Sequence, residues 1–270
     1  MKFIRTLRFV AMIVVIFSVS YNIRAEETYK RIIDVPQGSG PFPVIIYSHG
    51  SGGLGRALDT WKQVLVDSGF ATIFIDHYTP RGFDRSPPGR SGYRLNLKWR
   101  KEDLVSALKE VKADSRLDSS LITLVGASAG GNLPLIGVLN DDVKDEAGLN
   151  GSIKAAILFY PSILACVPRM SSEFFEIKPI ELPVLYLVGS EDTLIRACWD
   201  DLLSDIKSSD HPQIIKIYEG AKHAFDVAKR PRPCRTVRYK GIHELCSEFD
   251  EKTFQKSVID VREFLSKHAK

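Results

Sequence analysis

The sequence predicts an α/β protein in which a mostly parallel central sheet is covered by helices on both faces. Three observations favour this class. Short β-rich apolar runs alternate with amphipathic segments along most of the chain. The runs contain few polar residues, as expected for strands that are buried on both sides. No low-complexity segment, internal repeat or Pro/Gly/Ser-rich linker divides the chain, so a single large domain is expected after the N-terminal segment.

The expected elements follow one another in an order that builds such a sheet. Each expected strand is a short run rich in Val, Ile and Leu, and each expected helix repeats apolar residues at helical spacing, as Leu104, Leu108 and Val111 do. Strands are expected over residues 29–35, 43–47, 71–75, 121–125, 155–160, 184–188 and 214–218, the first of them at an edge. Helices are expected over residues 58–66, 99–111, 129–139, 195–206 and 254–265. Ligands of such sheets bind beyond the carboxyl ends of the strands, so the residues after each strand are the candidates for chemistry.

The N-terminal segment differs from the rest of the chain. Basic residues precede an apolar run over residues 9–19, and the small residue Ala25 follows, which is typical of a secretory signal peptide. A membrane span needs about 20 apolar residues, so this run is short for one, and an uncleaved N-terminal anchor is the alternative. The sequence therefore predicts a signal peptide over residues 1–25, a single domain over residues 26–270, and a protein that is periplasmic or secreted.

Removal of the signal peptide balances the formal charge. The whole chain has 37 Lys and Arg against 33 Asp and Glu, and residues 1–25 hold four basic residues and no acidic ones. Thus 37 minus 4 leaves 33 basic residues against 33 acidic ones in residues 26–270. The basic balance of the whole chain comes from the export signal, so no nucleic-acid partner is expected. Residues 26–270 are also expected to contain no stable membrane span.

A candidate nucleophile follows the strand expected at residues 121–125. Residues 126–130 read Gly-Ala-Ser-Ala-Gly, which is the G-x-S-x-G pattern of a nucleophile elbow. In this elbow a sharp turn lifts the hydroxyl of Ser128 out of the sheet, and small flanking residues let the backbone pass close to its neighbours. The pattern arises by chance in roughly one chain in ten of this length, so the rest of the chain has to support it.

Two further candidates follow the last two expected strands. Asp192 comes after residues 184–188, where a carboxylate can orient a histidine, and Glu191 is the reserve for this role. His223 comes after residues 214–218, where a general base is needed. Taken singly, these would be a loop acid and a surface histidine. Their order after Ser128 is the nucleophile–acid–histidine order of α/β-hydrolases, so the sequence predicts a catalytic triad.

A glycine-rich turn follows the first long strand, where residues 49–53 read His-Gly-Ser-Gly-Gly. Backbone N–H groups in such a turn can hold the negative oxygen that develops during acyl transfer. We expect the N–H groups of Ser51 and Ala129 to form this oxyanion hole, with an ordinary strand-to-helix turn as the alternative. His49 is expected to shape the loop, and His77, which follows residues 71–75, to line the pocket.

Two stretches rich in Lys and Arg come after expected strands, one after residues 71–75 and the other shortly after His223. Residues 80–101, which include Arg81, could face the pocket and favour an acyl group that carries a carboxylate, or could be a solvated loop. Residues 229–240 could form a lid or a membrane-surface contact, with a plain surface loop as the default.

Export permits disulfides among the four cysteines of the chain. Cys166 and Cys198 each lie shortly after the end of an expected strand, and these two strands are consecutive, so we expect them to pair. Cys234 and Cys246 would then close a local loop. Free thiols are the alternative.

The chain resembles the dienelactone hydrolase-like branch of the α/β-hydrolase superfamily, in a variant with a serine nucleophile. The resemblance rests on residues 49–53, 75–82 (Ile-Asp-His-Tyr-Thr-Pro-Arg-Gly), 126–131, 189–192 (Gly-Ser-Glu-Asp) and 218–226 (Tyr-Glu-Gly-Ala-Lys-His-Ala-Phe-Asp). It implies a serine-type hydrolase with Ser128, Asp192 and His223 as its triad and with no cofactor. Dienelactone hydrolases proper carry a cysteine nucleophile, so the resemblance concerns the fold and not dienelactone as a substrate.

The expected reaction is hydrolysis of a carboxylic ester of a small molecule through an acyl-enzyme. A peptidase, amidase or acyltransferase would use the same triad, and a non-catalytic binding protein would use the same fold. No H-E-x-x-H or comparable ligand cluster occurs, so no metal is expected.

Overall fold

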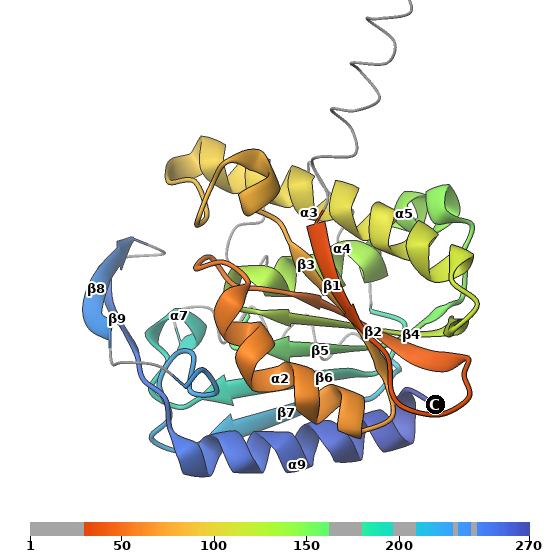
Figure 1. Cartoon of the computed structure of the whole chain (residues 1–270). Helices are drawn as coiled ribbons and strands as arrows, with labels where there is room; N and C mark the ends of the chain where they lie inside the picture. Colours follow the sequence, from red (N-terminus) through yellow and green to blue (C-terminus); the bar gives the residue numbers. More distant parts are fainter. Residues whose placement is uncertain (1–29, 162–179, 197–208, 229–231, 239–241) are drawn as a thin grey trace, which may run out of the picture.

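A seven-stranded sheet forms the centre of the computed structural model, which describes residues 30–161, 180–196, 209–228, 232–238 and 242–270 (Figure 1). The strand order is β1-β3-β2-β4-β5-β6-β7; β1 is antiparallel to β3, and all the other pairs are parallel. The strands are β1 (Lys30–Asp34), β2 (Phe42–Ser48), β3 (Ala71–Asp76), β4 (Leu117–Ala127), β5 (Ile153–Phe159), β6 (Val184–Gly189) and β7 (Gln213–Tyr218). The predicted fold class is confirmed, and so is the strand expected at one edge, whose antiparallel direction was not predicted.

Helices cover both faces of the sheet (Figure 1). One face carries α2 (Gly55–Asp67) and α9 (Glu251–His268), which meet where the ring of Trp61 lies 5.6 Å from that of Phe254. The other face carries α3, α4 and α5, which contact one another. Their bounds are α3 (Gly89–Ala113), α4 (Asn132–Leu139) and α5 (Asp141–Ala147). The shorter helices are the 3-10 turns η1 (Thr79–Arg81) and η2 (Ser128–Gly131), and α7 (Thr193–Arg196).

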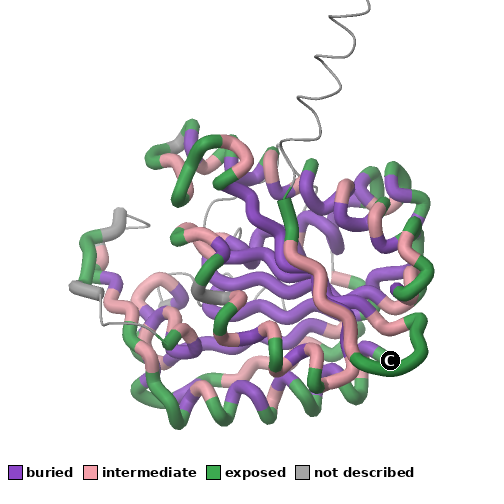
Figure 2. Tube along the Cα trace, viewed as in Figure 1, coloured by how far each residue is buried: buried purple, intermediate pink, exposed green. Residues whose placement is uncertain are grey.

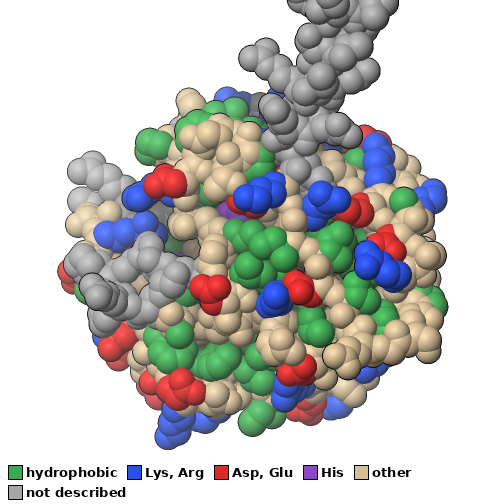
Figure 3. Space-filling model, viewed as in Figure 1, with side chains coloured by type: hydrophobic (Ala, Val, Ile, Leu, Met, Phe, Trp, Pro, Cys, Tyr) green, Lys and Arg blue, Asp and Glu red, His purple; other side chains and the backbone are tan. Residues whose placement is uncertain are grey.

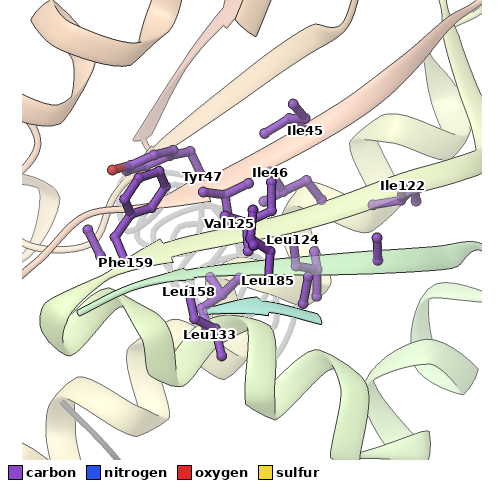
Figure 4. Packing of buried hydrophobic residues seen from close by; sticks show 14 of the residues in the cluster. Ile45, Ile46, Tyr47, Ile122, Leu124, Val125, Leu133, Leu158, Phe159 and Leu185 are labelled. Carbon is purple, nitrogen blue, oxygen red and sulfur yellow. The ribbon is translucent and has the colours of Figure 1, made fainter. Parts of the chain in front are cut away.

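The hydrophobic core lies between the sheet and these helices. The strands β3 and β6 are buried over their whole length, and Figure 2 shows buried strands between helices whose outer sides are exposed. The strand register puts Ile46, Leu124 and Leu158 of β2, β4 and β5 on the same face of the sheet, and Figure 4 shows them with Leu133 of α4. Side chains that are buried on both faces produce the nearly continuous apolar runs seen in the sequence.

The order of the strands has a topological switch point between β2 and β4. From β2 the chain moves outward to β3, and it then returns to the other side of β2 to form β4. Ser48, the last residue of β2, pairs with Gly126 near the end of β4. The connections that leave these two strands therefore diverge at one point, which is where ligands bind in open α/β sheets.

The helix α3 differs most from its predicted extent, and one expected helix is described only in part. The helix α3 begins at Gly89, ten residues before the expected start, because its first turns are largely exposed and carry no apolar repeat. The helix expected at residues 195–206 is described only as far as α7, and residues 197–208 lie outside the described residues. The short polar helix α5 was not predicted.

A two-stranded antiparallel ribbon, β8 (Arg232–Arg238) and β9 (Ile242–Ser247), occupies much of the second basic stretch. The sequence analysis expected a loop there, because strands outside the core carry no apolar run. A disulfide joins Cys234 to Cys246 across the ribbon, so the loop that this pair was expected to close is a hairpin. Cys166 and Cys198 lie outside the described residues.

Acidic and basic side chains are interspersed over the face shown in Figure 3. Among the helices that the structure describes, none combines the length and the apolar character that a membrane crossing requires.

Candidate active site

Ser128 lies at a sharp turn between β4 and α4, and its φ of 52° is unusual for a residue that carries a side chain. The glycines beside it are required by close backbone contacts. A Cβ on Gly130 would lie 2.0 Å from the carbonyl oxygen of Ser48, and one on Gly126 would lie 2.2 Å from that of Gly130. The turn therefore has the geometry of a nucleophile elbow, with the serine held in a strained conformation.

The structure brings the three residues of the predicted triad together. Nε2 of His223 lies 2.9 Å from Oγ of Ser128, and Nδ1 of His223 lies 2.6 Å from Oδ2 of Asp192. An ionised carboxylate only accepts hydrogen bonds, so Nδ1–H donates to it and Nε2 is left to accept from the serine hydroxyl. Asp192 is fully buried, whereas Ser128 retains 9% of its exposure and is reachable from outside. Glu191, the reserve acid, is exposed.

The carboxylate of Asp192 is oriented by the first turn of α7. Its Oδ1 accepts from the backbone N–H of Leu194 at 3.0 Å, so each carboxylate oxygen has its own partner. A carboxylate held in this way orients the imidazole of His223 and stabilises its charged form.

The strand β9 contacts the two loops that carry the acid and the histidine. The backbone N–H of His223 donates to the carbonyl of Cys246 at 3.2 Å, and the N–H of Glu248 donates to the carbonyl of His223 at 3.2 Å. On the other loop, the hydroxyl of Thr193 donates to the carbonyl of Glu244 at 2.9 Å. The disulfide-bonded ribbon therefore supports both loops, the His223 loop through backbone hydrogen bonds and the Asp192 loop through the Thr193 hydroxyl.

A buried carboxylate, Asp226, lies behind the histidine. It accepts from the hydroxyl of Tyr160 at 2.6 Å and from Nε1 of Trp61 at 2.6 Å, and the ring of Tyr160 packs edge-on against the ring of His223 at 4.7 Å. Burial raises the pKa of Asp226, and the two hydrogen bonds oppose that rise. The sequence motif at residues 218–226 includes Asp226, but only the fold shows what it contacts.

The glycine-rich loop lies against the elbow. A Cβ on Gly50 would lie 3.3 Å from the carbonyl oxygen of Ala127 and 3.4 Å from Cβ of Ser128. The expected oxyanion donors, Ser51 and Ala129, are therefore placed on the two segments that flank the serine, and both are partly exposed. Their role in binding an oxyanion stays a prediction.

Comparison with known proteins identifies the family. The family model of the dienelactone hydrolases matches residues 30–268. The chain belongs to the dienelactone hydrolase family. The predicted resemblance is confirmed, and membership of the family supports a hydrolase or esterase activity. No curated protein matches the chain.

Solved structures share the fold of this dienelactone hydrolase family member at low identity. A dienelactone hydrolase from Anabaena variabilis has a TM-score of 0.57 and 14% identity, over 90% of this chain and 93% of that one. An esterase from Pyrobaculum calidifontis has a TM-score of 0.59 and 14% identity, over 96% and 92%. A carboxylesterase from Lactobacillus plantarum has a TM-score of 0.59 and 14% identity, over 88% and 92%. These likenesses show the α/β-hydrolase fold.

Arg81 was expected at the pocket, but in this dienelactone hydrolase family member its guanidinium is bound to the scaffold. It donates to both oxygens of Asp103, at 2.7 and 3.0 Å, and to the carbonyl of His77 at 3.0 Å. Arg100, from the same basic stretch, is fully buried and donates to Ser48, Asn96 and Tyr78. These two arginines hold interior polar groups, so at their positions the first basic stretch is neither solvated nor a free anion site, whereas Arg85 in the same stretch is exposed.

His77 does not line a pocket, which corrects the expectation from its place after a strand. It is fully buried, and its two ring nitrogens lie 2.9 Å from Oγ of Ser48 and 2.6 Å from Oδ2 of Asp103. Burial raises the pKa of Asp103 to about 6, and the hydrogen bonds from Arg81 oppose that rise. His49 is also fully buried, within the glycine-rich loop.

Within the ranges that the structure describes, no three His, Cys, Asp or Glu side chains are grouped so that they could hold a metal ion.

Proposed function

We propose that this protein is a serine hydrolase that cleaves carboxylic esters of small molecules through a covalent acyl-enzyme. The observation that carries the proposal is the continuous hydrogen-bonded chain from Ser128 through His223 to Asp192, at 2.9 and 2.6 Å. The serine is at a strained turn and is reachable, while the acid is fully buried. Membership of the dienelactone hydrolase family supports the same class of reaction.

In the first half of the reaction, Nε2 of His223 takes the hydroxyl proton of Ser128 while Oγ attacks the ester carbonyl. The buried carboxylate of Asp192 stabilises the imidazolium that forms. The N–H groups of Ser51 and Ala129 bind the oxyanion. When the tetrahedral intermediate collapses, the imidazolium gives its proton to the leaving alcohol, and the acyl group stays on Ser128.

In the second half, water takes the place of the alcohol. His223 removes a proton from the water, whose oxygen attacks the acyl carbonyl. Collapse of the second intermediate returns the proton to Oγ of Ser128 and releases the acid. A second alcohol in place of water would give acyl transfer, and an amine as leaving group would make the protein an amidase. Ester and amide substrates with the same acyl group distinguish these reactions.

We also propose that the protein is exported. The support is the basic start, the short apolar run and the small residue Ala25 at the end of the N-terminal segment.

The test is hydrolysis of p-nitrophenyl acetate by residues 26–270, alone and with Ser128→Ala or His223→Ala. We expect kcat to fall by about 10⁴-fold or more in both variants. Ser120→Ala is the matched control, since Ser120 is an exposed serine on the same strand, and it keeps full activity.

Activity that survives in folded Ser128→Ala would overturn the proposal. If the parent protein is inactive on this ester, labelling with a fluorophosphonate decides between two cases. Covalent labelling at Ser128 shows a working nucleophile with a narrower substrate range, and no labelling favours a binding protein.

A further inference from the structure

A second Ser–His–Asp arrangement lies beneath the glycine-rich loop. Oγ of Ser48, the last residue of β2, lies 2.9 Å from Nε2 of His77, and Nδ1 of His77 lies 2.6 Å from Oδ2 of Asp103. His77 follows β3, and Asp103 is on α3. The three residues therefore join two neighbouring strands to a helix, directly before the loop at residues 49–53.

This arrangement is closed to substrate. Ser48 and His77 have no exposed surface, and Asp103 has 1%. The oxygen of Ser48 also accepts from the guanidinium of Arg100, so the hydroxyl can donate only to Nε2 of His77. Nδ1–H of His77 then donates to Asp103. Burial and the neighbouring charges of Arg100 and Arg81 hold the pKa of His77 well below its usual range, so its ring is neutral.

The same histidine is hydrogen-bonded to the loop through its backbone. The N–H of His77 donates to Nε2 of His49 at 3.1 Å. Because Nε2 accepts, the proton of the His49 ring is on Nδ1, and it donates to the carbonyl of Gly50 at 2.8 Å. His77 thus binds Ser48, at the end of β2, through its side chain, and it binds His49 through its backbone N–H.

The carbonyl of Gly50 determines where the N–H of Ser51 points. A trans peptide is planar, and its C=O and N–H point in opposite directions. The carbonyl accepts from His49 and, at 3.3 Å, from the N–H of Gly53, so the N–H of Ser51 is directed away from both. Since Gly50 packs against Cβ of Ser128, this peptide is next to the nucleophile.

We propose that His77 is a positioning residue that, through Ser48 and His49, holds the Gly50–Ser51 peptide with its N–H toward the oxyanion. Asp103, clamped by Arg81, holds His77 in turn. The inference rests on the proposed esterase function, because an oxyanion forms only if Ser128 attacks a carbonyl. A donor that is held in place before the reaction stabilises the transition state and not the bound substrate.

The experiment uses His77→Phe, which keeps a ring of similar shape and removes both side-chain hydrogen bonds. Amide hydrogen exchange of residues 49–53 is measured by mass spectrometry, and kcat and KM are measured with p-nitrophenyl acetate. We expect exchange in this loop to be about 10-fold faster or more, and kcat to fall about 10- to 100-fold while KM changes less than about 2-fold.

Two further variants make the result specific. Ser48→Ala removes one hydroxyl from the Ser48–His77–Asp103 arrangement. It is a smaller change than His77→Phe and replaces that variant if it does not fold. We expect the same faster loop exchange and the same fall in kcat. Leu108→Ala is the control, since Leu108 is a fully buried apolar residue on the helix that carries Asp103. It should lower Tm while loop exchange and kcat stay as in the parent.

Unchanged loop exchange in the folded variants overturns the inference, and so does faster exchange with an unchanged kcat. These outcomes differ from failure of the proposed function. If the parent is active and only Ser128→Ala is inactive, the esterase stands while the role of His77 is rejected. If the parent has no activity and a fluorophosphonate does not label Ser128, the esterase function fails, and hydrogen exchange still decides whether His77 orders the loop.

Discussion

At the scale of single residues, the elbow depends on the absence of side chains. The backbone of Gly130 approaches the carbonyl of Ser48, the last residue of β2, so the segment after Ser128 packs directly on the neighbouring strand. A side chain at this position would displace backbone, which cannot move aside as the end of a flexible side chain can.

We predict that Gly130→Ala lowers the free energy of unfolding by about 3 kcal/mol or more and removes activity, because its Cβ would overlap the carbonyl of Ser48. Gly55→Ala is the matched control at the start of α2, since nothing lies within 4 Å of the Cβ it adds. Urea unfolding and ester hydrolysis measure both effects. Equal stability of the two variants would contradict the prediction.

Asp226 is a buried carboxyl that lies behind His223, next to the ring of Tyr160. We expect Asp226→Asn, which keeps the shape of the side chain, to lower kcat by about 10-fold, because the imidazolium of His223 loses a nearby negative charge. The acidic limb of the profile of kcat/KM against pH should move to lower pH for the same reason. A profile identical to that of the parent would show that the Asp226 carboxyl carries no charge during the reaction.

At the scale of elements, the ribbon β8–β9 is, with α5, a part of the fold that sequence patterns did not predict. Its strand β9 hydrogen-bonds to the His223 loop and to the residue after Asp192, yet the ribbon lies outside the central sheet. A small ribbon of this kind is marginal by itself, so the disulfide between Cys234 and Cys246 is its main constraint.

We predict that replacing Cys234 and Cys246 together by Ser loosens the ribbon and lowers kcat, because the backbone partners of His223 become mobile. A disulfide that closes a loop of this length stabilises the folded state by about 2–4 kcal/mol, mostly because it lowers the conformational entropy of the unfolded chain. The rate of amide hydrogen exchange in residues 242–248 should rise under conditions in which the rest of the protein stays folded. If the double variant has the same exchange rates and the same kcat as the parent, β8 and β9 stay paired without the disulfide.

The N-terminus of α9 provides a test of pH dependence. The side chain of Asp250 caps this helix and accepts from the backbone N–H of Thr253 at 2.6 Å. Hydrogen bonds from Thr253 lower the pKa of Asp250 from its ordinary value of 3.8. A folded pKa below the unfolded one means that this stabilisation is complete above about pH 4–5 and is lost as the pH falls through the folded pKa.

We expect Asp250→Ala to lower the free energy of unfolding by about 1 kcal/mol at pH 7. The difference between the parent and Asp250→Ala should shrink as the pH is lowered from 5 to 3. Asp250→Asn retains an accepting oxygen and serves as the control that does not titrate. Thermal unfolding over this pH range measures the three proteins, and a difference that grows at low pH would contradict the assignment.

At the scale of the whole molecule, the site is assembled from four strand ends. The glycine-rich loop follows β2, Ser128 follows β4, Asp192 follows β6 and His223 follows β7. Parallel strands bring these ends to one edge of the sheet although up to 174 residues separate His49 from His223 in the chain. The chemistry is therefore a property of the complete sheet and of no single segment.

Export concerns the chain as a whole. We predict that the protein recovered from an exporting host begins at Glu26, as N-terminal sequencing or intact mass would show, because cleavage after Ala25 removes the signal peptide. A protein that starts at Met1 and stays with the membrane fraction would instead indicate an N-terminal anchor.

The sequence by itself predicted the sheet, its mostly parallel character and the meeting of Ser128, Asp192 and His223. Strands buried on both faces leave apolar runs, and residues at the ends of parallel strands meet at one edge, so run and position together were sufficient for Ser128, Asp192 and His223. The same reasoning placed His77 and Arg81 after a strand, but it could not tell which way their side chains turn.

Only the tertiary structure decided those directions. His77 and Arg81 turn inward to Asp103, which is on a helix whose first turns carry no apolar repeat, and Asp226 turns toward Trp61 and Tyr160. Polar side chains must find partners when they are buried, and those partners come from distant parts of the chain. Local sequence patterns indicate which segments of the chain are buried. Which polar side chains pair across the molecule is determined only when the helices and strands pack together.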